Sequence, residues 1–307
     1  MIAVSVMETA LPVFLAIALG MLLRGRGFLT RDGVDTLKKV IVNVTLPFVL
    51  FNAFATAEYS LAALVLPLIM FGVCCLALVL GKLAVKLFRL PGRLSAFLAT
   101  GFEAGMLGYA LFVLLFPDVS VSEFALPDIG QTLFVFTLYK ILLSGKTDWK
   151  AIGRDMASTP ILWAVGAGVL VGATGLYGAM TRWGVSGVLD SITSFLSAPT
   201  GMIILLTVGY DLVIKEIPWE RVGSLIAMRL IIAAICYGVL VLLNRTLLGG
   251  MLFEGAALLM VILPPPYVLP VFADEASERV QVASALSALT LITVVLFAVC
   301  TVVLKLI

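Results

Sequence analysis

The chain alternates long apolar runs with short stretches that carry charged residues, glycine or proline. A membrane-spanning helix needs about 20 predominantly apolar residues, and the pattern predicts ten such helices. No segment between them is long enough for a separate soluble domain, so we expect a single transmembrane domain covering residues 1–307. The predicted spans are Val4–Leu23, Val40–Ala57, Leu61–Gly81, Leu94–Phe116, Ile129–Ser144, Ser158–Leu176, Val188–Val208, Val222–Leu243, Gly255–Phe272 and Val280–Leu304.

Ten helices divide into two sets of five, and the sixth must then enter the membrane from the side opposite to the first. A repeat relating the two halves would be inverted, a plan that many secondary transporters share. Matching features occur at matching places. The second and seventh spans contain Pro47 and Pro199, and the fourth and ninth are interrupted by a glycine-rich stretch (101–108) and by Pro264–Pro266. The expected fold is an all-α membrane protein with a 5+5 inverted repeat.

The two interrupted spans are the strongest functional signal in the pattern. Proline inside a helix removes a backbone donor and clashes with the preceding turn. Irregular backbone at membrane depth is tolerated only where protein or a wet cavity surrounds it, and a matched pair of broken spans indicates a transport site. We therefore expect these spans to unwind near Gly105–Gly108 and Pro264–Pro266 and to cross near mid-membrane. Ordinary packing kinks are the alternative.

Composition strengthens the membrane assignment. The chain is 62% hydrophobic and 12% charged, whereas a soluble domain is typically about half apolar and one-quarter charged. Its net charge of +2 gives no reason to expect a nucleic-acid partner. Lipid must therefore be the solvent for much of the surface.

The distribution of Lys and Arg predicts the orientation. The segment Met1–Glu8 has neither residue, whereas Arg24 and Arg26 follow the first span. Because short cytoplasmic loops are enriched in Lys and Arg, we expect both termini to lie outside. The protein is expected to be a multi-pass protein of the cell (inner) membrane. The acidic segment that ends at Asp128 is expected in an outer loop.

Several enzyme classes are excluded. The sequence has no histidine, so Gly184–Gly187, which spells the GxSG motif of intramembrane serine proteases, lacks the base that this chemistry needs. No P-loop motif is present, so no nucleotide-driven step is expected. We expect no catalytic residue, metal or cofactor. The four cysteines lie in apolar runs and are interpreted as structural thiols: Cys74, Cys75, Cys236 and Cys300.

Three segments, in this order, resemble the auxin efflux carrier family: Leu11–Phe14, Arg24–Leu29 and Asn43–Pro47. That family includes bacterial malonate-type permeases and is distantly similar to bile acid:sodium symporters. The resemblance implies a crossover fold with scaffold helices at about 4–57 and 158–208. Mobile transport helices would lie at about 61–144 and 222–304, and spans four and nine would cross at the substrate site.

Family members usually carry Asn-x-Gly-x-x-Gly-x-Pro at the fourth-span break. Here Gly105 and Gly108 match the glycines, while Glu103 stands at the Asn and Ala110 at the Pro. A carboxylate inside a span costs about 2.5–3.5 kcal/mol on insertion scales, so Glu103 should face the interior or a cavity. Desolvation disfavours its charged form, which makes a proton carrier plausible; a static hydrogen bond is the alternative.

Other polar residues complete the candidate site. Lys140 and Arg229 either snorkel to the inner face or pair with a substrate carboxylate. Asn43 and Asn52, on the second span, either bind solute or join helices, and the same two alternatives hold for Gln131 and Thr132 at the outer end of the fifth span. The candidate substrate-binding or coupling residues are Glu103, Gly105, Gly108, Tyr109, Pro265, Pro266, Tyr267, Asn43 and Asn52.

These features predict a secondary transporter of small organic anions that works by alternating access. Coupling to H⁺ through Glu103, or uniport, is better supported than coupling to Na⁺. A solute-sensing or channel-like membrane module with the same fold is the alternative. The lipid bilayer is an expected partner, and the sequence leaves a homodimer open.

Overall fold

The structure is a computed structural model in which residues 2–57, 61–90, 92–144, 154, 157–212, 217–272 and 276–306 are described. These residues are helical or in short connections, and none of them lies in a β-strand. The elements of the first half are α1 (Ile2–Gly25), α2 (Arg31–Val40), η1 (Ile41–Thr45), α3 (Leu46–Ala55), α4 (Leu61–Phe88), η2 (Ser95–Ala99), η3 (Ala104–Gly108), α5 (Tyr109–Leu115), α6 (Ser122–Phe134), η4 (Val135–Tyr139) and α7 (Lys140–Ser144).

The second half is helical as well. Its elements are α9 (Pro160–Ala173), α10 (Leu176–Arg182), α11 (Ser186–Ser197), α12 (Thr200–Asp211), α13 (Trp219–Thr246), α14 (Glu254–Ile262), η6 (Leu269–Phe272) and α15 (Ala276–Leu306). Of the short η elements, η1, η3 and η4 are π-helical turns, whereas η2 and η6 are 3₁₀ turns.

Seven helical segments among the described residues are long and apolar enough to cross a membrane. The pair α9 and α10 adds an eighth if it is one span, and its two helices are bent by 62° relative to each other. The predicted spans at residues 94–116 and 255–272 are both divided into short pieces and do not pass the same test. The all-helical membrane class is confirmed, whereas the ten-helix inverted repeat stays a prediction.

Proline and glycine explain several helix boundaries. Pro160 begins α9, where its missing N–H costs nothing. Gly175, at φ 70°, separates α9 from α10 because its backbone takes the left-handed conformation that ends a helix. Pro199 lies between α11 and α12, and Pro47 follows the π-turn η1 at the start of α3. At Pro47 and Pro199 the helical segment nevertheless continues across the proline.

Small residues let helices approach closely. The Cα of Gly168 on α9 faces α3, where an added Cβ would lie 2.7 Å from the Phe51 carbonyl oxygen. The same holds between α1 and α12, since a Cβ on Gly209 would lie 2.0 Å from the Ile17 carbonyl oxygen. A Cβ on Gly130 of α6 would meet the Pro67 carbonyl oxygen of α4 at 1.8 Å. These positions tolerate only glycine, because backbone would have to move for any side chain.

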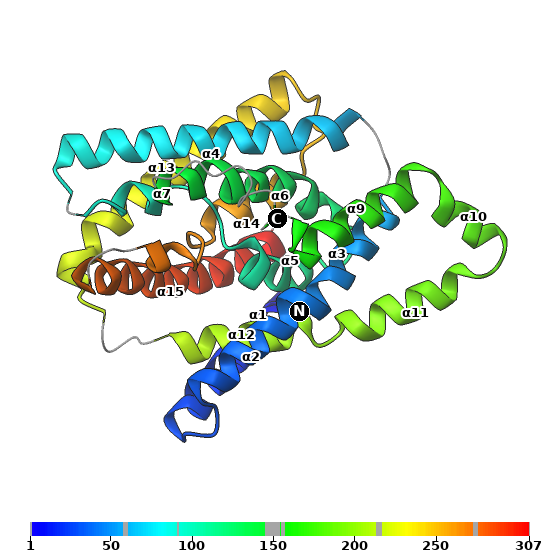
Figure 1. Cartoon of the computed structure of the whole chain (residues 1–307), viewed down its shortest axis with the longest axis horizontal. Coiled ribbons are helices and arrows are strands. Elements are labelled where there is room, and N and C mark those ends of the chain that lie inside the picture. The colour runs from blue at the N-terminus through cyan, green and yellow to red at the C-terminus, as the bar shows by residue number, and fades with distance from the viewer. Residues whose placement is uncertain are drawn as a thin grey trace.

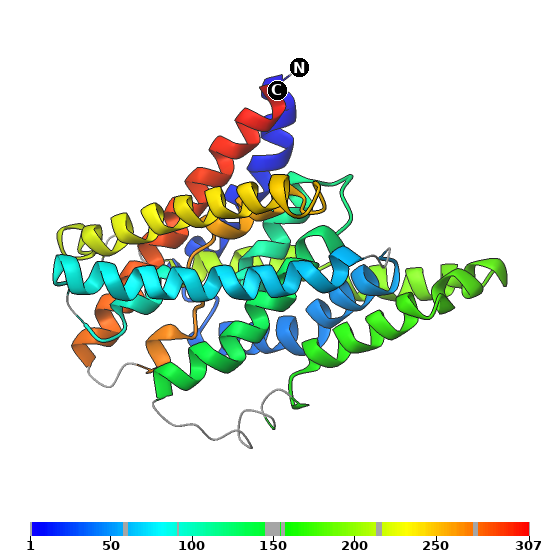
Figure 2. The same ribbon diagram turned by 90° about the horizontal axis from the view of Figure 1, so that it is seen from above.

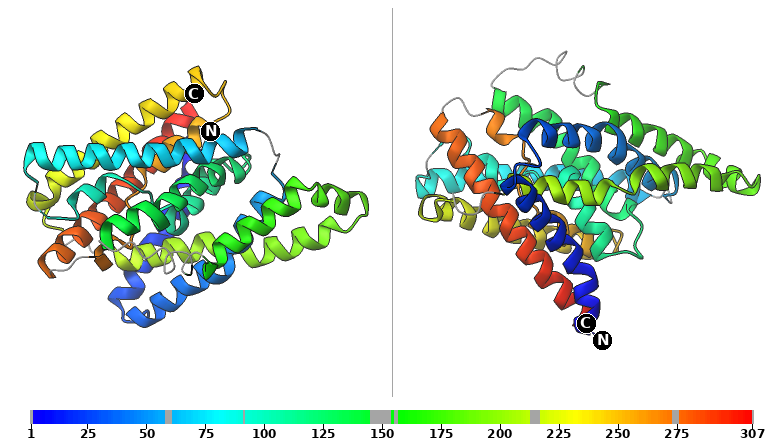
Figure 3. Two further views of the ribbon diagram at one scale, coloured as in Figure 1. Left: turned by 45° about the horizontal axis from the view of Figure 1, so that its top comes forward. Right: turned by 90° about the horizontal axis from the view of Figure 1, so that it is seen from below.

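The helices form two neighbouring groups. Helices α4, α6, α13 and α14 lie together, and α3, α9 and α11 form an arm that projects from them (Figure 1). Helices α1 and α15 run side by side, so the two chain ends meet at the same end of the molecule (Figures 2 and 3). Termini on the same side are what an even number of crossings requires. Which group moves stays a prediction.

Candidate functional site

The break in the fourth span lies at residues 100–103, between η2 and η3. Gly101 takes φ 70°, and a Cβ added there would lie 2.9 Å from Cγ and Cδ of Pro266. Glycine is therefore required both by the backbone conformation and by the packing. The expected position, Gly105–Gly108, was wrong by a few residues: it forms the π-turn η3, which continues directly into α5.

The break in the ninth span lies where the sequence predicts it. Helix α14 ends at Ile262, and Leu263 is extended at φ −62°, ψ 150°. The three buried residues Pro264–Pro266 follow, and the helical turn η6 begins only at Leu269. Consecutive prolines lack the N–H groups needed to continue a helix and hold the preceding residue extended.

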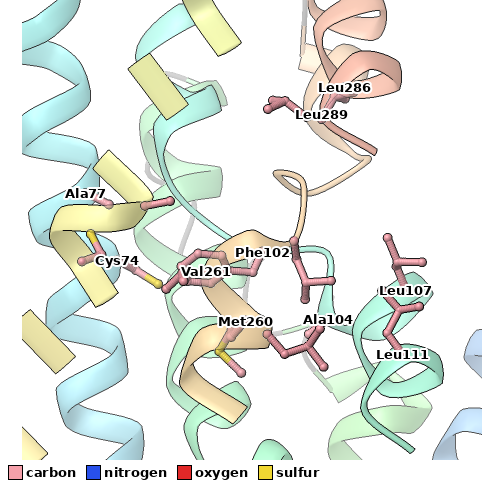
Figure 4. Packing of buried hydrophobic residues seen from close by; sticks show 14 of the residues in the cluster. Cys74, Ala77, Phe102, Ala104, Leu107, Leu111, Met260, Val261, Leu286 and Leu289 are labelled. Atoms are coloured by element: carbon pink, nitrogen blue, oxygen red, sulfur yellow. The ribbon is translucent and has the colours of Figure 1, made fainter. Parts of the chain in front are cut away.

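The two breaks lie against each other and are joined by two hydrogen bonds. The Glu103 N–H donates to the Pro264 carbonyl oxygen at 2.9 Å. In return, Oε2 of Glu103 accepts the Tyr267 N–H at 2.6 Å. Backbone groups that a continuous helix would pair internally are therefore paired across the crossing. Apolar side chains from α4, α5, α14 and α15 surround this point (Figure 4).

Arg229 of α13 also joins the two breaks. Its Nη2 donates to the carbonyl oxygens of Gly101, at 3.0 Å, and of Leu263, at 2.9 Å. The guanidinium lies 5.0 Å from the Phe102 ring centroid, and the residue is only 2% exposed. Snorkelling to the inner face is thus wrong for Arg229. Its partners are carbonyls of two distant segments, which no spacing in the sequence reveals.

A cavity of about 320 Å³ opens beside the crossing, and we call it the crossover cavity. Five of the predicted site residues line it, and so do three polar residues of α6. Two of these three, Gln131 and Thr132, were expected either to bind solute or to join helices, whereas Asp128 was expected in a loop. The predicted residues are Glu103, Gly105, Tyr109, Pro266 and Tyr267, and the additional ones are Asp128, Gln131 and Thr132.

The remaining predicted residues lie outside this lining. Gly108 packs where a Cβ would come within 2.7 Å of Phe124, and Pro265 is buried in its break. Asn43 is exposed and its Nδ2 donates back to the Lys39 carbonyl oxygen at 2.7 Å. Lys140 begins α7 and does not line the cavity.

Two further cavities flank the crossover cavity. The larger, about 720 Å³, lies between α3, α5, α11 and α12, and we call it the outer cavity because the predicted orientation places it on that side. Asn52 lines it and accepts a hydrogen bond from Thr193 at 3.3 Å. Its described polar lining consists of hydroxyl and amide groups and contains no Lys, Arg, Asp or Glu.

The other flanking cavity, about 370 Å³, is charged, and we call it the basic cavity. Arg31, Lys38 and Arg279 line it together with Asp211. Asp211 Oδ1 pairs with Arg31 at 2.9 Å, and Oδ2 pairs with Lys38. Tyr267 lines both this cavity and the crossover cavity, so the two are neighbours.

Asp128 is the functional candidate that the sequence reasoning missed. It was expected in an outer loop, but α6 begins at Ser122 and carries Asp128 inward, where it is 7% exposed. Its carboxylate accepts hydrogen bonds from Tyr109 Oη at 2.7 Å and from Gln131 Nε2 at 3.2 Å. The predicted fifth span began at Ile129, which left Asp128 in the preceding loop. The i, i+3, i+4 spacing of Asp128, Gln131 and Thr132 on one helix face was the available signal.

The chain is similar in sequence to known membrane transport proteins. Residues 5–151 match the model of a family described as membrane transport protein. A curated protein of Methanothermobacter thermautotrophicus, described as an uncharacterized transporter, is 26% identical over 216 residues, which are 67% of each chain. These matches confirm the resemblance at the level of the family. The chain is a multi-pass membrane transport protein rather than an enzyme.

Proposed function

We propose that this transport protein is a secondary transporter that binds a small organic carboxylate in the crossover cavity and moves it together with a proton. The observation that carries the proposal is the meeting of two broken spans beside that cavity, with Glu103 joined to both. Broken helices that meet in this way are the usual setting of a substrate site in such carriers. The volume of about 320 Å³ is suited to a small solute.

The charges of the cavity support proton coupling. Among its described lining residues, Glu103 and Asp128 are acidic and none is Lys or Arg. An anionic solute would be repelled by two nearby carboxylates in a medium of low dielectric constant. Protonation of Glu103 removes one of these charges and provides a donor for the solute carboxylate. Entry of the anion would therefore require a proton.

The contacts between the halves of the site support alternating access. Glu103 lies in the break of one span and accepts a hydrogen bond from the backbone of the other. A proton on Glu103 weakens this bond, because a bond to a charged acceptor is roughly twice as strong as one to a neutral group. Proton uptake, solute binding and the relative position of the two breaks would then be coupled.

The test is transport and binding by the Glu103→Gln variant. Glutamine keeps the shape and can still accept from the Tyr267 N–H, but it does not titrate in this range. Purified protein is screened by thermal shift against small mono- and dicarboxylates at acidic and neutral pH, and the best ligand is used for uptake into proteoliposomes. Glu220→Gln, on the exposed first turn of α13, is the matched control.

We expect Glu103→Gln to express and to remain monodisperse in detergent while losing the pH dependence of solute binding. The control should behave as the wild type, with uptake that rises as the pH falls. A Glu103→Gln variant that binds and transports like the wild type at every pH would show that Glu103 is structural. Carboxylates that stabilise neither protein at any pH would contradict the substrate class.

A further inference from the structure

Tyr109 separates two of the cavities. It begins α5 directly after the π-turn η3 and is 3% exposed. Among the described lining residues, Tyr109 alone is shared by the outer cavity and the crossover cavity. Its ring packs edge-on against Phe124, with 5.0 Å between the ring centroids. A solute passing between the two cavities therefore has to pass the Tyr109 side chain.

Asp128 determines where the Tyr109 hydroxyl is held. The phenol donates to Asp128 Oδ2 at 2.7 Å, and Gln131 Nε2 and Thr132 Oγ1 lie 3.2 Å and 3.4 Å from Oδ1. All three partners present donors to the carboxylate, an arrangement that suits its ionised form. Such bonds are roughly twice as strong as bonds between neutral groups. The ionised carboxylate thus holds the tyrosine firmly.

None of the described residues that line the two cavities around this carboxylate is Lys or Arg. Asp128 lines two cavities: the crossover cavity and a small pocket between α3, α6 and α9. The other ionisable residues among their described lining residues are all acids: Glu103, Tyr109 and Tyr267. The side chains that α3 and α9 contribute to these linings are apolar. A buried carboxylate with no basic partner is costly to keep charged.

Gln131 supplies a buried acceptor next to this carboxyl group. Its Nε2 also donates to the Phe102 carbonyl oxygen at 2.9 Å, so both amide hydrogens face acceptors and the amide cannot be flipped. The Oε1 atom of the same amide is buried and has no hydrogen-bond partner among the described residues. A proton on Asp128 would place a donor beside this acceptor.

We infer that Asp128 is a second proton-binding site of the carrier, and that its bond to Tyr109 closes the passage between the outer cavity and the crossover cavity. When Asp128 takes up a proton, its charge is lost and the carboxyl becomes a donor that turns toward Gln131 Oε1. The Tyr109 hydroxyl then loses its strong acceptor, and the ring is free to swing. Protons arriving from the outer side would open the site to that side.

The inference deepens the proposed function, but its test needs no solute. A Val42→Cys reporter lines the crossover cavity and not the outer cavity. It is placed in a parent with Cys75 and Cys300 replaced by Ala, since the other two cysteines are buried. Intact cells are treated with a membrane-impermeant thiol reagent, and the labelling rate of Val42→Cys is measured. This rate is divided by the labelling rate of a reference variant, Asp118→Cys, whose position is exposed. This ratio corrects for the effect of pH on thiol reactivity.

We expect slow labelling of Val42→Cys at neutral pH and faster labelling as the external pH falls. Adding Tyr109→Phe or Asp128→Asn should raise the labelling rate of Val42→Cys at neutral pH about tenfold, because one hydrogen bond to a charged group is lost. Both variants should lose the pH dependence of labelling. The Tyr109→Phe variant keeps the packed ring, so it provides a reading even if Asp128→Asn folds poorly.

Folded Tyr109→Phe protein that is labelled at the parent rate, with the parent pH dependence, would overturn the inference. So would a parent whose labelling ratio does not change with external pH. Neither result depends on uptake of a solute. The carboxylate screen can therefore fail while the labelling test confirms the passage, and the labelling test can fail while the screen succeeds.

Discussion

The two broken spans reach the same geometry by opposite chemical means. The fourth span breaks at Gly101, which has no side chain and takes φ 70° against the Pro266 ring. The ninth breaks at Pro264–Pro266, whose rings remove the donors that a helix needs. The break in the fourth span depends on Gly101 alone, because no other residue fits there, whereas each of the three prolines in the ninth span by itself prevents a continuous helix. The two breaks should therefore differ in their tolerance to mutation.

The largest effect is expected where one residue serves both breaks. Arg229→Met removes the donor of the Gly101 and Leu263 carbonyl oxygens and leaves two buried acceptors unpaired. Each unpaired buried group costs about 1–3 kcal/mol, so the loss of stability should reach about 2–6 kcal/mol. The thermal unfolding midpoint in detergent measures it. Arg245→Met, which removes a 72% exposed side chain, is the control and should cost at most about 1 kcal/mol.

A midpoint for Arg229→Met close to that of the control would show that the two breaks hold together without the guanidinium. The hydrogen bonds from Arg229 to the Gly101 and Leu263 carbonyl oxygens would then contribute little to the stability of the fold.

A smaller effect is expected from Gly101→Ala. An alanine at φ 70° is strained by about 1–3 kcal/mol, and its Cβ would lie 2.9 Å from the Pro266 ring. Gly105→Ala is the matched control, since its Cβ would meet only Leu46 Cδ2, at 3.6 Å. The control should change the unfolding free energy by less than about 1 kcal/mol. Equal midpoints for the two variants would disprove the special role of Gly101.

The smallest effect is expected from Pro265→Ala. Pro264 and Pro266 remain on either side and still prevent a helix, so only the lower chain entropy that proline gives the unfolded state is lost. That loss is about 0.4–1 kcal/mol. The unfolding midpoint should lie well above that of Gly101→Ala. If Pro265→Ala is the less stable of the two, the proline break is not redundant.

Of the two carboxylates that line the crossover cavity, the sequence predicted one as a site residue and missed the other. Glu103 lies in the middle of an apolar run, where a charge is conspicuous, and the structure places it at the crossing. Asp128 follows Pro127 at the edge of a run and resembles a loop residue, yet α6 begins six residues earlier and buries it. Hydropathy detects a charge that is surrounded by apolar neighbours. It does not detect one that shares its helical turns with other polar groups.

The sequence by itself determined the membrane class, the helical content and the positions of both interruptions to within a few residues. These depend on local properties: the length of apolar runs, the missing N–H of proline and the missing side chain of glycine. Only the tertiary structure decided that Arg229 binds carbonyls from both breaks and that Asp128 holds Tyr109 between two cavities. Those contacts join separate segments, and the packing of helices against one another brings them within reach.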